Sequence, residues 1–184
     1  MNKETKKNID TLAGLIHEII FRNGEMNLET ALESAGITVQ FFNDDEFDGF
    51  LKWDKRNNKP IISVNANHAE VRRNFSMAHE LGHLVLNFRW IPYSSSNPAP
   101  DNEILNVTKY RGGSYTEKEK PEEVIANEFA AGFLIPDDDL RTIINEMTDG
   151  DYVRLVGTVA ERFNVSTQAA SIRIDNFLSL QEKA

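Results

Sequence analysis

The chain has 184 residues, of which 40% are apolar and 27% charged, and its net charge is −9. This composition is typical of a globular protein, and the negative charge argues against broad binding to nucleic acid or anionic membranes. The absence of cysteine excludes a disulfide framework, so any zinc site must use histidine and carboxylate ligands. No apolar stretch resembles a signal peptide or reaches the length of a membrane span, and we expect a cytoplasmic protein.

The first third of the chain predicts two helices followed by three strands. Apolar residues recur at helical spacing from about residue 5 to 22, and a shorter helix is expected over 28–34, before Gly36. Strands are predicted at 37–42, 47–53 and 59–64, with residues 54–58 as the hairpin loop between the last two. We expect Asn65 or Asn67 to cap the helix that follows.

That next helix carries His79-Glu80-x-x-His83 inside an otherwise apolar run from Phe75 to Leu86. Residues four apart lie on one face of a helix, so both imidazoles would aim at one point, as in zinc metalloproteases. Glu80, rotated by about 100°, is placed to take a proton from a water molecule rather than to bind the metal. The alternative is a buried helix with unpaired polar side chains, which would cost roughly 1–3 kcal/mol each.

Prolines, serines and glycines then mark a long irregular segment over residues 90–121. Such a segment forms one wall of a substrate cleft or is an insertion without a role. Pro121 opens another helix, which ends before Pro136. Further helices are predicted over 137–147, 152–163 and 167–180.

A catalytic zinc usually has three protein ligands and one open position, so one ligand remains to be found. The helix after the irregular segment offers Glu122, Glu123 and Glu128. Helix geometry alone does not choose among them.

Two motifs together resemble the ImmA/IrrE family of zinc-dependent metallopeptidases. His79-Glu80-x-x-His83 is followed by Glu123-x-x-Ala126-Asn127-x-Phe129-Ala130-Ala131 and then by Leu134-Ile135-Pro136. The resemblance covers about residues 37–136, and Phe133 and Ile135, in place of the usual Leu and Met, affect packing only. It implies an α+β, zincin-like fold with a small mixed or antiparallel sheet. We divide the chain into a metallopeptidase domain, 1–150, and a C-terminal, helix-turn-helix-like pair, 151–184.

By this resemblance, Glu123 joins His79 and His83 as the third ligand of a Zn²⁺ cofactor, and Glu80 is the catalytic base. Asn127, one turn after Glu123, would either orient a ligand or serve as a helix-packing amide. The candidates for a second oxyanion donor are left unranked, and they are His68, Tyr93, Tyr110 and Tyr115. The strand over 59–64 is expected to hold the substrate backbone by edge pairing.

The resemblance also implies a function, a site-specific endopeptidase that cleaves a partner transcriptional repressor of a prophage, mobile element or stress response. The alternative is a regulator that binds DNA itself, because residues 159–173 have the pattern of a helix-turn-helix. Four basic and four acidic residues cancel over 151–184, so we expect partner docking there rather than direct DNA binding. A metal-bound sensor without proteolytic activity is a third reading.

Overall fold

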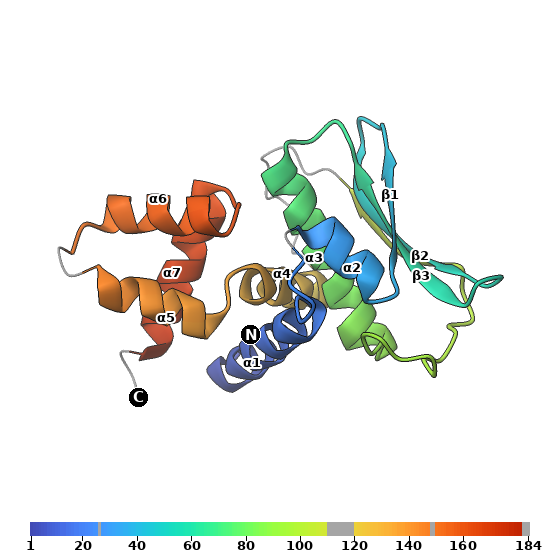
Figure 1. Cartoon of the computed structure of the whole chain (residues 1–184), viewed down its shortest axis with the longest axis horizontal. Helices are drawn as coiled ribbons and strands as arrows, with labels where there is room; N and C mark the ends of the chain where they lie inside the picture. The colour runs from blue at the N-terminus through green and yellow to red at the C-terminus, as the bar shows by residue number, and fades with distance from the viewer. Residues whose placement is uncertain (26, 110–119, 148–149, 182–184) are drawn as a thin grey trace.

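The computed structural model describes residues 1–25, 27–109, 120–147 and 150–181. Within these ranges the chain forms seven helices and four strands, which confirms the predicted α+β class. Figure 1 shows the labelled helices on one side of a twisted sheet. In chain order the elements are α1 (Lys3–Ile20), α2 (Leu28–Ser34), β1 (Thr38–Phe42), β2 (Phe47–Asp54), β3 (Lys59–Asn65), α3 (Glu70–Phe88), β4 (Ile104–Lys109), α4 (Pro121–Leu134), α5 (Asp137–Glu146), α6 (Tyr152–Arg162) and α7 (Thr167–Gln181).

The sheet is mixed, with the strand order β1-β3-β2-β4. β1 runs parallel to β3, whereas β2 is antiparallel to both β3 and β4. The prediction that residues 59–64 form an edge strand is therefore wrong, because β3 has a partner on each side. Its side chains are buried almost continuously from Ile62 to Asn65, as expected of a central strand.

The strand β4 corrects a second prediction, that residues 90–121 are irregular throughout. Ile104-Leu105-Asn106-Val107-Thr108 alternates in side-chain type, but its strand character depends on pairing with β2. The antiparallel pairing contains register shifts between Phe47 and Gly49 and between Leu51 and Lys52. In the strand order, β4 lies at one edge of the sheet, next to β2.

The start of α3 also differs from the prediction. Neither Asn65 nor Asn67 caps it, since the N-cap residue is Ala69 and no side chain forms a capping hydrogen bond to the first turn. The Asn65 amide is used elsewhere, donating to the carbonyl oxygens of Asp44 at 2.5 Å and Phe47 at 2.7 Å. Asn65 thus fastens the loop before β2 instead of starting the helix.

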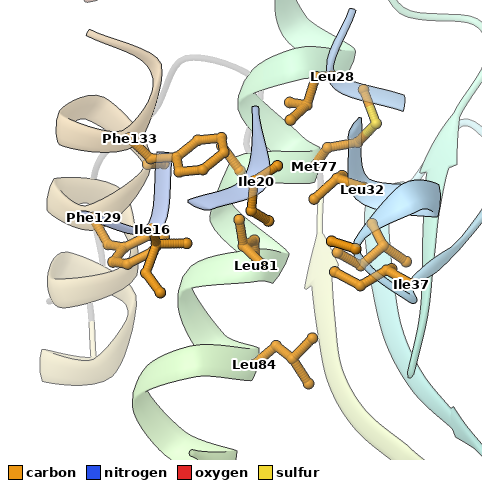
Figure 2. Packing of buried hydrophobic residues seen from close by; sticks show 14 of the residues in the cluster. Ile16, Ile20, Leu28, Leu32, Ile37, Met77, Leu81, Leu84, Phe129 and Phe133 are labelled. Atoms are coloured by element: carbon orange, nitrogen blue, oxygen red, sulfur yellow. The ribbon is translucent and has the colours of Figure 1, made fainter. Parts of the chain in front are cut away.

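The main core lies between α1, α2, α3, α4 and the inner face of the sheet. Leu81 of α3 is fully buried and sits among side chains of three other helices (Figure 2). The residues labelled there are Ile16, Ile20, Leu28, Leu32, Ile37, Met77, Leu81, Leu84, Phe129 and Phe133. Burying each large apolar side chain contributes about 1.5–3 kcal/mol, so this core fixes α3 against α4.

A second apolar cluster holds α5, α6 and α7 together. It begins at Ile135 and includes Leu140, Val159 and Phe177. Figure 1 shows these three helices grouped to one side of α1 and α4. The division between residues 150 and 151 stays a prediction. None of the described helices is long and apolar enough to cross a lipid bilayer.

Candidate metal centre

Helix α3 brings the two histidines of the motif together. His79 and His83 lie one turn apart, are only 4% and 3% exposed, and point their Nε2 atoms at each other across 3.1 Å. A surface helix would not bury two imidazoles in this way. Here the packing of α3 between the sheet and α4 encloses both rings.

Helix α4 brings one carboxylate to the same point. Its first turn contains Pro121, Glu122 and Glu123, a sequence that suits the positive end of a helix. Glu123 Oε2 lies 3.2 Å from His79 Nε2, and Glu123 Oε1 lies 3.4 Å from His83 Nε2. The structure thus brings together His79, His83 and Glu123, the set that the family resemblance implies.

The ligand atoms of these three side chains lie within 4.8 Å of one another, close enough to hold one zinc ion. Zinc bonds to histidine and carboxylate of about 2.0–2.1 Å imply ligand atoms about 3.3 Å apart in a tetrahedron. The two Nε2 atoms lie 3.1 Å apart, and the Glu123 oxygens lie 3.2 Å (Oε2) and 3.4 Å (Oε1) from His79 Nε2 and His83 Nε2 respectively. Two imidazoles and one carboxylate are also a common donor set of catalytic zinc. The residues present therefore fit the implied metal.

The charges of the centre favour a cation. Hydrogen bonds from His79 and His83 hold the pKa of the Glu123 carboxyl well below its usual range. Burial lowers the pKa of His79, but its bond to Glu123 and the negative charge of Glu80 outweigh burial and raise that pKa above its ordinary value. A positive charge is thus favoured between these groups, as a divalent ion would supply.

The outer nitrogen of each imidazole has an amide neighbour. His79 Nδ1 lies 2.9 Å from Asn127 Oδ1, so this nitrogen donates. Nε2 would become a metal ligand by giving up the proton that it shares with Glu123. On the other ring, Asn87 Nδ2 donates to His83 Nδ1 at 3.1 Å, which leaves the proton on Nε2. Zinc binding through Nε2 would require that proton on Nδ1 and the Asn87 amide turned over.

Glu80 is completely buried and lies outside the ligand set. Its carboxylate accepts hydrogen bonds from Thr108 and Asn106 of β4. Neither residue is among the site residues predicted from the sequence, because both fall in the segment predicted to be irregular. Asn87 was also missed, although its position four residues after His83 was a signal for it.

The remaining candidates lie elsewhere or outside the described residues. Glu122 is exposed beside Lys120, and Glu128 is paired with Lys6. His68 Nδ1 lies 3.1 Å from Asp48 Oδ1, and the Tyr93 hydroxyl donates to the carbonyl oxygen of Ile20 at 3.1 Å. These two side chains are not brought to the histidines. Tyr110 and Tyr115, the other predicted oxyanion donors, lie outside the described residues.

Comparison with known proteins then decides the family. The sequence model of the IrrE N-terminal-like domain, peptidase family M78, matches residues 32–175. This chain belongs to that family. The predicted resemblance to the ImmA/IrrE metallopeptidases is thereby confirmed, and the His79, His83 and Glu123 side chains form its candidate metal site.

A phage protein is among the relatives of this M78 chain. The protein of Bacillus phage phi105 described as "Uncharacterized immunity region protein 2" is 37% identical over 92 residues. The match covers 50% of this chain and 47% of the phage protein, so the chain spans about half the length of this relative. The similarity is thus partial and does not by itself extend to the whole phage protein.

Proposed function

We propose that this protein is a zinc-dependent, site-specific endopeptidase whose substrate is a helix-turn-helix transcriptional repressor. The observation that carries the proposal is the convergence of His79, His83 and Glu123 from two helices, with Glu80 next in the chain to one of them. Two imidazole donors favour zinc over harder divalent ions. The absence of cysteine suits the reducing cytoplasm, where we place the protein.

In this proposal the three ligand side chains hold Zn²⁺ and Glu80 moves protons. When bound, the ion supplies Lewis acidity to a peptide carbonyl and lowers the pKa of a water molecule. Glu80 takes a proton from the attacking water and delivers it to the amine that leaves. Asn127 orients His79 through Nδ1, so that Nε2 stays available as a ligand.

Of the two edge strands, β1 and β4, the one whose side chains contact Glu80 is β4, and the substrate backbone would pair with its outer edge. This replaces the pairing expected at residues 59–64, since β3 is central. Among the described strands, β2 is the one partner of β4, and it pairs with the inner side of β4. An extended segment of substrate at the free edge would form main-chain hydrogen bonds next to the Asn106 and Thr108 side chains that hold Glu80.

A repressor as substrate is supported by the family and by charge. The ImmA/IrrE resemblance implies such a substrate, and the name of the phage relative refers to an immunity region. The net charge of −9 would also attract a basic DNA-binding protein and speed its encounter with the enzyme.

DNA binding by this chain itself is the second candidate function, because α6 and α7 are joined by a short turn as in a helix-turn-helix. The basic side chain of α7 counts against it. Arg173 is fully buried and bonded to Asp10 and Asp137, so it is not free to contact phosphate. DNA affinity that falls steeply with salt would nevertheless favour this alternative.

The test uses the purified full chain and the repressor encoded beside its gene. Elemental analysis should find about one zinc per chain, and mass spectrometry should find one cut in the repressor. Glu80→Gln should keep the zinc and lower cleavage by at least about 100-fold, since the base is lost. Glu122→Gln, an exposed acid on α4, is the matched control and should cut normally. Cleavage by Glu80→Gln at the normal rate would contradict the assigned role.

A further inference from the structure

The Glu80 carboxylate is held by side chains of the edge strand rather than by its own helix. Thr108 Oγ1 donates to Glu80 Oε1 at 2.7 Å, and Asn106 Nδ2 donates to Glu80 Oε2 at 3.1 Å. Each carboxylate oxygen thus has one donor from β4. Because Glu80 is 0% exposed, these donors replace the water that would otherwise solvate the charge.

The two donors also act on each other. Asn106 Nδ2 lies 3.2 Å from Thr108 Oγ1 and donates to it, so the single hydroxyl proton of Thr108 is left for Glu80. Residues 106 and 108 alternate along the strand and share the face that points at α3. The direction of each hydrogen bond is therefore fixed. The Asn106 amide donates to Thr108 and to Glu80, and the Thr108 hydroxyl donates to Glu80.

The neighbouring strand leaves room for this arrangement. Gly49 of β2 pairs with Thr108, directly after a register shift in the ladder. A Cβ atom on Gly49 would lie 3.1 Å from Glu80 Oε1 and 3.3 Å from the carbonyl oxygen of Ser63. Any larger residue would press on the carboxylate from the sheet. Shifts of register that re-aim side chains are common beside active sites.

We propose that Thr108 and Asn106 are positioning residues that fix the orientation of the Glu80 carboxylate from the sheet edge. This inference rests on the proposed function, in which Glu80 is the base. Each oxygen keeps a further lone pair for a proton, while rotation about the end of the side chain is stopped. The two residues thus act on the proton-transfer step and leave the zinc ligands untouched.

The first measurement does not depend on proteolysis. Infrared difference spectra of zinc-loaded protein labelled with ¹³C-glutamate, taken against Glu80→Gln, isolate the stretching bands of this one carboxylate. Thr108→Val removes the hydroxyl at nearly constant shape and should shift the antisymmetric band to higher wavenumber, whereas Thr108→Ser should restore it. Thr142→Val, the same change on the exposed face of α5, is the control and should leave the band in place.

The second measurement follows cleavage of the neighbouring repressor by the same variants. Thr108→Val and Asn106→Leu should lower kcat roughly 10- to 100-fold at unchanged zinc content and KM, and Thr108→Ser should recover most of it. An unshifted carboxylate band in Thr108→Val would overturn the positioning role, even if the wild type is a peptidase. A shifted band in a protein that cuts no repressor would support the positioning role and contradict the proposed function instead.

Discussion

The three acidic residues of α4 have different partners. Glu122 reaches solvent near Lys120, and Glu128 turns towards α1 and pairs with Lys6. Glu123 alone of the three lies against His79 and His83. Since each acid has its own partner, the loss of Glu123 has no ready substitute on this helix.

Glu123→Ala should therefore weaken zinc binding severely. Loss of a group that only orients a ligand typically costs about 10–100-fold in affinity, so loss of a ligand should cost at least about 100-fold. Competition with a chromophoric chelator measures the affinity directly. Glu122→Ala is the matched control, because it removes the neighbouring acid and should bind zinc as the wild type does. Equal affinities in the two variants would mean that Glu123 is no ligand.

For single residues, the sequence predicted the side chains that meet on one helix and missed the contacts between side chains of different elements. The spacing of His79 and His83 was enough to place both imidazoles on one face. Helix geometry left Glu123 open among three acids, and the family resemblance was needed to choose it. Thr108 and Asn106 were beyond reach, because their contact with Glu80 exists only once β4 pairs with β2.

The distance between α3 and α4 sets the geometry of the centre. A Cβ atom on Gly82 of α3 would lie 3.1 Å from a ring carbon of Phe129 and 3.3 Å from the carbonyl oxygen of Ala126. Both neighbours belong to α4, and one of them is backbone. The two helices can approach this closely because residue 82 has no side chain.

Gly82→Ala should loosen the metal centre without touching a ligand. The methyl group should push α4 outwards, and overpacking of about 1–3 kcal/mol should exceed the gain of about 1 kcal/mol in helix propensity. Both the free energy of unfolding of the metal-free protein and the zinc affinity should fall. The first follows from urea denaturation and the second from chelator competition.

The control for this change is Gly157→Ala on α6, where an added Cβ atom would meet nothing within 4 Å. That variant should gain up to about 1 kcal/mol in stability and bind zinc normally. If Gly82→Ala also became more stable at full zinc affinity, the close approach of the helices would not position the ligands.

The helices were predicted well, and the sheet was predicted only in part. The helical boundaries follow from local signals such as Gly36 and Pro121, and they agree with the structure to within a few residues. The place of a strand in a sheet is not local. β3 was expected at an edge, but β1 and β2 flank it. β4 takes an edge position although Ile104, Val107 and Thr108 favour strands, because the prolines and glycines around them led to the prediction of an irregular segment.

Over the whole molecule, one arginine joins α5 and α7 to the metal-binding part. Arg173 of α7 is 0% exposed, and its guanidinium donates to Asp10 of α1 at 2.9 Å and to Asp137 of α5 at 2.6 Å. Its Nε donates to the carbonyl oxygen of Ile135 at 3.1 Å. A fully buried cation needs such partners, since removing one of them leaves an uncompensated charge. The hydrogen bonds of Arg173 to Asp10, Asp137 and Ile135 thus connect the two apolar clusters.

The buried contact of Arg173 with Asp10 should make stability depend on pH. Burial raises the pKa of Asp10 to about 6, against the opposing charge of Arg173; Glu128 and Asp137 add to the rise, and Lys6 opposes it. The folded protein then holds this proton to higher pH than the unfolded chain does, so stability should fall as pH rises from about 4 to 6. A shift of this size corresponds to on the order of 3 kcal/mol.

Asp10→Asn isolates this effect, because the amide resembles the protonated acid and can still accept from Arg173. Urea denaturation at pH 4 and pH 7 gives the free energy of unfolding of each protein. The stability of the wild type relative to Asp10→Asn should decrease by on the order of 3 kcal/mol from the lower pH to the higher. Asp138→Asn, on the exposed first turn of α5, is the control. If wild type and Asp10→Asn differed in free energy of unfolding by the same amount at pH 4 and pH 7, the raised pKa of Asp10 would be contradicted. Arg173 and Asp10 would then form an ion pair throughout that pH range.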